Sequence, residues 1–357
     1  MFNNVYKNKT IFITGHTGFK GSWLSLWLLK LGANVVGYSL KPMTTPNLFS
    51  ILNLKNRIKH IVGDVRDRKK LLKNLQAHKP DMVFHLAAQA LVRDSYDDPT
   101  LTYETNVLGT LNLFEAIRQV SSIKAVVNVT TDKVYDNKEK DEGYKENEPL
   151  GGYDPYSSSK ACSEIVTASY RSSFFNPNDY GTKHHVAIAT ARAGNVIGGG
   201  DWAKDRLLPD IVRSLSQKQD LVLRNPQSTR PWQYVLEPLS GYLLLGSLLY
   251  QRNIAYSGAW NFGPKNSDVV TVEKLVKKVI KIWGEGHYVI KKDKRKHEAK
   301  LLKLNIFNAM RRLHWSPRYN SQTAITETIE WYKKYYSKKT DMYEYSMEQL
   351  NKYRRRS

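Results

Sequence analysis

The chain is poor in cysteine and in long apolar runs. Its 357 residues include one cysteine, Cys162, which cannot form a disulfide within the chain or supply a multi-cysteine zinc site. The longest uncharged apolar run, 238–250, is shorter than the ~20 residues of a membrane-spanning helix. The first 14 residues show no signal-peptide pattern. We therefore expect a cytoplasmic protein with no membrane partner.

Acidic residues are also scarce, 33 against 55 Lys and Arg, and the first of them is Asp64. The resulting charge of +22 attracts phosphate-bearing partners. A non-catalytic nucleic-acid binder would combine basic and aromatic residues on one element, and only 331–339 and 352–356 approach this pattern. Part of the excess charge lies in the dense run 291–296 and the tail 354–356, and we predict no nucleic-acid partner.

Short β-branched runs alternate with helical patterns through the first 193 residues. Strands are predicted at 10–14, 34–38, 58–62, 81–86, 125–130 and 185–190, and helical spacing occupies 23–31, 69–76 and 101–120. This alternation predicts an α/β fold with a doubly wound parallel Rossmann sheet, whose ligands bind at the carboxyl ends of its strands.

The pattern loosens after residue 193, with helices predicted at 209–216 and 272–283. We therefore predict a dinucleotide-binding domain over 1–193, with a return segment near 233–262. Residues 194–357 are expected to form mainly a second, smaller substrate-binding lobe.

A glycine-rich loop connects the first predicted strand to the first helix. It reads Gly15-x-x-Gly18-x-x-Gly21. Glycines let the backbone turn tightly and approach a pyrophosphate, which then binds the free amides at the start of the helix. The loop therefore predicts a dinucleotide site.

The carboxylate that normally holds the adenosine ribose at the end of the second strand is missing. Ser39 and Lys41 stand there instead. Ser39 could bond a ribose hydroxyl, whereas Lys41 would favour a 2′-phosphate, so these residues leave NAD and NADP open. Asp64 follows the third strand, where it could accept from the adenine amino group or cap a helix.

Tyr156 and Lys160 are one helical turn apart. A lysine there can lower the tyrosine pKa from its usual ~10, so that the phenol acts as acid or base. The same spacing at Tyr288 and Tyr335 lies in charge-rich segments and is interpreted as solvated helix surface.

Thr131, Asp132 and Lys133 follow the fifth strand, whose end faces the cofactor in this fold. Asn106, on the preceding helix, could order water or backbone, or simply distort the helix.

The glycine loop, His85-Leu-Ala-Ala88, Asn106, Thr131 and the Tyr156/Lys160 pair resemble the extended short-chain dehydrogenase/reductase family. The strings 14–23, 132–139, 192–202 and 230–232 are similar to its members that remove water from nucleotide sugars. The resemblance implies NAD as cofactor, bound by Gly15, Thr17, Gly18, Phe19, Gly21, Ser39, Asp64, Val65, Leu86, Ala87, Ala88, Asn106, Tyr156 and Lys160.

The resemblance also implies a substrate and a reaction. The substrate is CDP-glucose or another nucleoside-diphosphate sugar, and hydride passes from C4 to C6 through NAD. Tyr156, with Lys160 and Thr131, would take the C4 hydroxyl proton. Where related dTDP-glucose dehydratases carry Asp-Glu, this chain has Asp132 and Lys133, our hypothetical acid and C5 base. The base requires a lysine pKa lowered from ~10.4 to ~7–8, by burial and by neighbouring positive charge.

Four residues match positions that hold the substrate diphosphate in the family: Asn195, Arg206, Arg224 and Arg230. Arginine suits a diphosphate because it bonds in bidentate fashion, although each could be an ordinary surface residue. A 4-epimerase or decarboxylase on the same scaffold is the main rival, but an epimerase needs no acid–base pair. We predict no metal site, because no His-Glu-x-x-His occurs. Relatives pair helices 101–120 and 157–171, which implies a homodimer or homotetramer.

Overall fold

The computed structural model describes residues 2–223, 225–251, 254–265, 268, 270–290 and 301–356. Its centre is a seven-stranded sheet in the order β11-β6-β5-β4-β1-β2-β3, in which all neighbouring strands are parallel. The strands are β1 (Thr10–Thr14), β2 (Asn34–Ser39), β3 (Lys59–Val62), β4 (Met82–His85), β5 (Ala125–Val129), β6 (Ala187–Ala193) and β11 (Gly258–Phe262). The predicted doubly wound parallel sheet is confirmed.

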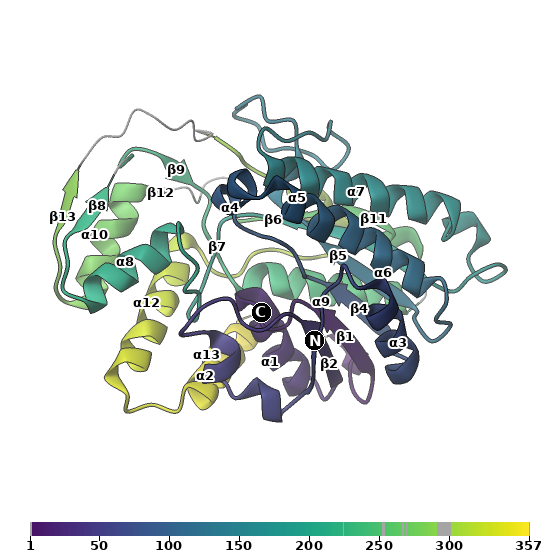
Figure 1. The fold of residues 1–357 in the computed structure, drawn as a ribbon. Coiled ribbons are helices and arrows are strands. Elements are labelled where there is room, and N and C mark those ends of the chain that lie inside the picture. The colour runs from purple at the N-terminus through teal and green to yellow at the C-terminus, as the bar shows by residue number, and fades with distance from the viewer. Residues whose placement is uncertain are drawn as a thin grey trace.

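Helices cover both faces of the sheet (Figure 1). Ile11 and Ile13 point into one core cluster and Phe12 into the other, as alternate residues of a strand must. One face packs against α1 (Phe19–Lys30) and α9 (Leu236–Tyr250), and the other against α3 (Arg68–His78), α6 (Gly109–Ile117) and α7 (Pro155–Ser173).

The strand order reverses between β1 and β4, so their carboxyl ends flank the crevice where this fold binds ligands. The two strand ends lie very close together. A Cβ on Gly15, after β1, would lie 2.6 Å from the backbone nitrogen of Ala87, after β4.

The predicted helix 101–120 is divided in the structure. It consists of α5 (Pro99–Tyr103), a π-helical turn at Glu104–Leu108 and α6. The turn contains Asn106, whose side chain bonds the Gln89 backbone and Ser159 outside the helix. The two alternatives left open by the sequence, ordering of backbone and distortion of the helix, therefore occur together.

The second lobe lies at the left of Figure 1, beyond the carboxyl edge of the sheet. Its helices are α8 (Leu207–Ser216), α10 (Val272–Trp283) and α12 (Ser321–Ser337), of which the first two match the predicted ones. Three short strand pairs accompany them: β7 (Val196–Ile197) with β10 (Gln233–Tyr234), β8 (Leu221–Leu223) with β13 (Tyr288–Ile290), and β9 (Thr229–Arg230) with β12 (Val270–Thr271). Between them, 236–262 returns to the main sheet as α9 and β11.

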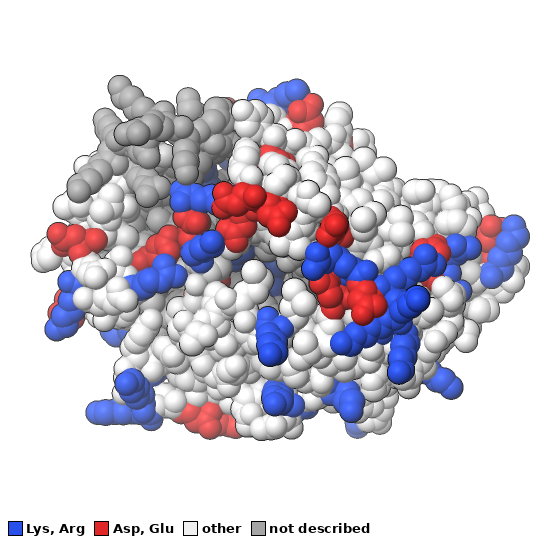
Figure 2. Space-filling model, in the orientation of Figure 1, with Lys and Arg blue, Asp and Glu red and all other residues white. Residues whose placement is uncertain are grey.

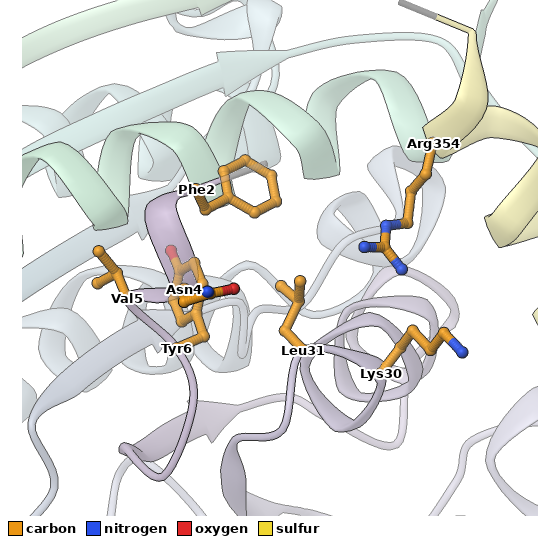
Figure 3. A pocket seen from close by; sticks show the side chains of 7 residues that line it. All are labelled: Phe2, Asn4, Val5, Tyr6, Lys30, Leu31 and Arg354. Atoms are coloured by element: carbon orange, nitrogen blue, oxygen red, sulfur yellow. The ribbon is translucent and has the colours of Figure 1, made fainter.

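The C-terminal helix α13 (Met342–Arg355) packs back against α1. The Tyr353 ring lies 5.7 Å from that of Trp27, and its hydroxyl donates to Glu237 Oε2 at 2.7 Å. Arg354, Lys30 and the first residues of the chain line a cavity of about 130 Å³ beside this contact (Figure 3). The two ends of the described chain are therefore neighbours.

Basic side chains are scattered over the face in Figure 2 and are interleaved with acidic ones rather than joined in a band. Two predicted features, the charge run 291–296 and Arg224, lie outside the described residues. Among the residues that are described, no helix combines the length and apolarity needed to cross a bilayer.

Candidate active site

The three loop glycines have different surroundings. Gly15 has φ of +78°, and a Cβ on Gly21 would lie 2.2 Å from the Gly15 carbonyl oxygen, so the fold itself requires both. A Cβ on Gly18 would come no closer than 3.4 Å to that oxygen. Gly18 precedes the first turn of α1 and gives its amides no side-chain cap. Room for a Cβ beside uncapped amides fits a pyrophosphate at this position.

Thr17 and Ser39 lie together beside the loop. The Thr17 hydroxyl is 2.8 Å from Ser39 Oγ and donates to the Leu40 carbonyl at 3.0 Å. Asp64 is held by Arg66 in an ion pair of 2.8 Å. Burial opposes ionisation of Asp64, but the Arg66 hydrogen bonds and charge lower its pKa. Ser39 thus contacts the glycine loop through Thr17, whereas Asp64 follows β3, two strands away from β1.

The loop after β4 is held in place by hydrogen bonds to Thr14 at the end of β1. Thr14 Oγ1 accepts from the backbone nitrogens of Leu86 and Ala87 at 3.2 Å and lies 2.7 Å from His85 Nδ1. Burial lowers the His85 pKa to about 3, with Lys160 adding to the effect, so this histidine stays neutral. The predicted residues 86–88 are consequently held at the edge of the crevice.

Three further predicted cofactor residues pack around this crevice. Phe19 begins α1, and Val65 is buried beneath Gly109. Asn106 accepts from the Gln89 amide at 2.9 Å and donates to Ser159 at 2.8 Å. Asn106 therefore joins the loop after β4 to α7 through protein groups.

Tyr156 and Lys160 are both buried on α7. Lys160 Nζ donates to the Val129 carbonyl at 3.0 Å, and burial lowers its pKa to about 8. Burial raises the Tyr156 pKa to about 12, against a hydrogen bond with Thr131 that lowers it. The pair therefore combines a lysine whose pKa is lowered to about 8 with a phenol whose pKa is raised, not lowered as the Tyr/Lys spacing led us to expect.

Asp132 and Lys133 follow on a short 3₁₀ turn (Asp132–Val134). Asp132 is buried, and its Oδ1 accepts from Thr131 Oγ1 at 3.0 Å. A Cβ on Gly194 would lie 1.8 Å from its Oδ2, so the carboxyl group packs directly on that glycine. Lys133 is half-buried beside it.

The predicted diphosphate residues have different positions. Arg206 precedes α8, bonds Asp201 at 3.0 Å, and lies close enough to Tyr156 for its charge to act there. Asn195 follows Gly194 and has φ of +50°. Arg230 belongs to β9 and donates to the Thr229 carbonyl at 3.0 Å. Arg224 lies outside the described residues.

Sequence reasoning missed a buried ion pair behind this site. Arg192 Nε donates to Glu164 Oε1 at 2.9 Å, and both side chains are only 4% exposed. Thr130 and Thr190 also donate to Glu164. Glu164 stands one helical turn after Lys160, a spacing that could have suggested a shared inward face. The pair fixes α7 to the ends of β5 and β6.

It also missed Lys20, which is half-buried in the first turn of α1. The feature of the sequence that could have marked Lys20 is a charged side chain at the junction of the glycine loop and the helix. Across the described part of the chain, no group of three His, Cys, Asp or Glu could hold a metal ion.

A glycine loop at the sheet's reversal point, facing a buried Tyr/Lys pair, defines an extended short-chain dehydrogenase/reductase. Within that class, the profile of the GDP-mannose 4,6-dehydratase family matches residues 12–328, and the chain belongs to this family.

Comparisons with individual relatives support this family assignment. The chain is 51% identical over 331 residues to a CDP-glucose 4,6-dehydratase of Salmonella typhimurium, covering 92% of each chain. It is 26% identical to a dTDP-glucose 4,6-dehydratase of Xanthomonas campestris, over 90% of this chain and 93% of the relative.

Among solved structures, a dTDP-glucose 4,6-dehydratase of Streptomyces venezuelae with NAD bound superposes with a TM-score of 0.77. That comparison covers 93% of this chain and 99% of the other at 22% identity, and it supports the fold.

Proposed function

We propose that the chain dehydrates CDP-glucose to its 4-keto-6-deoxy product, with NAD as cofactor. The observation that carries this proposal is the 51% identity, over 92% of both chains, to the CDP-glucose 4,6-dehydratase of Salmonella typhimurium. The loop around Gly18 and the buried Tyr156/Lys160 pair support it independently.

The cofactor chemistry would be reversible hydride transfer, from C4 of the sugar to bound NAD and back to C6. Tyr156 takes the proton of the C4 hydroxyl. Its pKa of about 12 must first fall. The charge of Arg206 already acts in that direction, and we assign the same effect to a protonated Lys160 and to the bound cofactor. Thr131 holds the phenol by its hydrogen bond. The reaction removes one water from the substrate and causes no net oxidation or reduction.

Asp132 and Lys133 carry out the elimination in this proposal. Asp132 gives its proton to the departing C6 hydroxyl, and Lys133 removes the C5 hydrogen, which the 4-ketone acidifies. The turn at Asp132–Val134 supports the assignment because it follows Thr131 directly.

Solvent exchange tests the base. In D₂O, Lys133→Ala should incorporate deuterium at C5 at least ~100-fold more slowly than the unaltered chain, as expected when a general base is lost. Lys138→Ala is the control, because Lys138 is a well-exposed lysine in the same loop. Exchange at the unaltered rate in Lys133→Ala would reject Lys133 as the base.

We propose that the substrate diphosphate is held by four residues of the second lobe: Asn195, Arg206, Arg224 and Arg230. Arg206 has the strongest support because its charge already acts on Tyr156. We accordingly retain 1–193 as the cofactor domain and 194–357 as mainly the substrate lobe, and we place the enzyme in the cytoplasm.

We further propose a homodimer, or a tetramer built from it, through the outer face of α5, the π-turn and α7. That face exposes Tyr103, Leu108 and Ile165, of which Ile165 is 57% exposed. A groove of about 470 Å³ crosses it, lined in part by Cys162 and Leu108. Apolar surface of this kind marks interaction sites.

A substrate panel tests the function. The full chain with NAD should convert CDP-glucose to a product lighter by one water, and prefer it over dTDP-, UDP- and GDP-glucose by at least about tenfold in kcat/KM. An epimer of unchanged mass would favour the rival 4-epimerase, and conversion of none of the four would reject the dehydratase.

A further inference from the structure

The half-buried side chain of Lys20 extends from the glycine loop toward Tyr242. Its Nζ lies 5.8 Å from the centroid of the Tyr242 ring on α9. The charges of Arg206, Lys160 and Asp132 all act on it. A side chain that begins at the glycine loop therefore reaches toward the residues assigned to catalysis.

The surroundings of Lys20 leave its charge poorly compensated. Within the described residues, no carboxylate forms an ion pair with it and its ammonium donates no hydrogen bond, although Asp132 attracts it. Burial, followed by the charges of Arg206 and Lys160, lowers its pKa to about 8. The neighbouring Tyr242 hydroxyl is buried and has no hydrogen-bond partner in the same part of the chain. Polar groups held in this way are expected to meet a ligand.

The fold indicates which part of a dinucleotide would meet Lys20. A pyrophosphate over Gly18 has the adenosine half toward β2 and β3, where Ser39 and Asp64 lie. The other half then extends across the reversal point toward the ends of β4 and β5. Lys160 and Asp132 stand on that side, and Lys20 points toward them.

We propose that the Lys20 ammonium lies beside the nicotinamide ring and makes bound NAD a stronger hydride acceptor. This inference rests on the proposed NAD dependence. The oxidised ring carries a positive charge that is lost when it takes two electrons and a proton as hydride, while the hydroxyl proton of the sugar goes to Tyr156. A nearby cation repels the oxidised ring and not the reduced one, and the repulsion is strong where water is excluded.

The ratio of the Kd of NADH to that of NAD⁺ tests this directly, without turnover. Both nucleotides are titrated calorimetrically into the full chain, freed of bound nucleotide, at pH 7. Lys20→Met should shift the ratio by about tenfold in favour of NAD⁺, the effect of one nearby charge. Lys20→Arg, which keeps the charge, should retain the original ratio.

Further variants make the result decisive. Lys30→Met, at the far end of α1, is the control and should change neither affinity. Lys20→Gln serves as a second neutral variant should Lys20→Met fold poorly. Equal losses of both affinities would show that Lys20 holds the pyrophosphate instead, and an unchanged ratio would also overturn the proposal. Failure of the unaltered chain to bind either nucleotide would instead reject NAD as the cofactor, and this inference with it.

Discussion

Gly18 and Gly21 allow cofactor binding to be separated from folding. A Cβ at Gly18 fits at 3.4 Å, whereas one at Gly21 would lie 2.2 Å from a backbone oxygen. Gly18→Ala should therefore change the free energy of unfolding by less than about 1 kcal/mol but weaken NAD binding at least about tenfold. Gly21→Ala should lose roughly 1–3 kcal/mol of stability. Urea unfolding and calorimetry measure the two effects, and a stable Gly18→Ala variant with full NAD affinity would contradict the assignment of this loop.

Buried histidines predict loss of stability in acid. Burial lowers the pKa of His85 and of His16 to about 3, from the usual 6.5. Between pH 6.5 and about 3, the unfolded chain binds more protons than the folded one at these sites, so stability falls as pH falls. His85→Gln should reduce the difference in unfolding free energy between pH 7 and pH 5, measured in urea. An undiminished difference would mean that His85 does not titrate this way.

At the residue scale, sequence reasoning found groups whose spacing shows their chemistry, such as the loop glycines and the Tyr156/Lys160 pair. It missed groups whose importance depends on distant neighbours. Glu237, for example, is buried and accepts a hydrogen bond from the backbone nitrogen of Tyr319 at 2.7 Å. Burial raises its pKa to about 7. Such contacts join residues far apart in the sequence, so the residues next to Glu237 in the chain do not predict them.

The catalytic helix α7 depends on the ion pair that ties it to β6. Arg192→Met leaves Glu164 buried without its main partner and should cost about 3–5 kcal/mol in the free energy of unfolding. The double variant Glu164→Gln/Arg192→Met should recover part of this loss, because no charge is then left unpaired. Urea unfolding measures both variants, and a double variant less stable than the single one would show that the loss arises from packing.

Elements with strong periodicity were predictable within about two residues, as β1 and α10 show. The stretch 101–120 was not resolved into its three parts. A π-turn shifts the helical spacing by one residue, but α5 and α6 on either side are too short for that shift to stand out in the sequence. Only the bonds of Asn106 reveal the break.

The assembly of two chains can be tested on the exposed apolar face. Leu108→Glu, at a residue 50% exposed on the π-turn, should convert a dimer to monomers in light scattering, since it buries a charge in the interface. Met310→Glu is the control, because Met310 is 43% exposed on α11 (Phe307–Arg312). Dimers that persist in Leu108→Glu would place the interface elsewhere.

For the whole molecule, the alternation of strands and helices predicted the main sheet because each unit is local and periodic. The second lobe was less predictable, since its strands β7, β9, β10 and β12 are each two residues long. Such strands carry no detectable alternation, and tertiary contacts alone create them.

The contact between Tyr353 and Trp27 has a consequence for synthesis of the chain. All seven strands of the sheet have been synthesised once residue 262 is translated, but the helix that covers Trp27 still lies some eighty residues ahead. Until then the Glu237 carboxyl group also lacks the hydroxyl of Tyr353. The nascent first domain therefore carries an uncovered aromatic surface, and a chaperone or a slow folding step is expected to act during this interval.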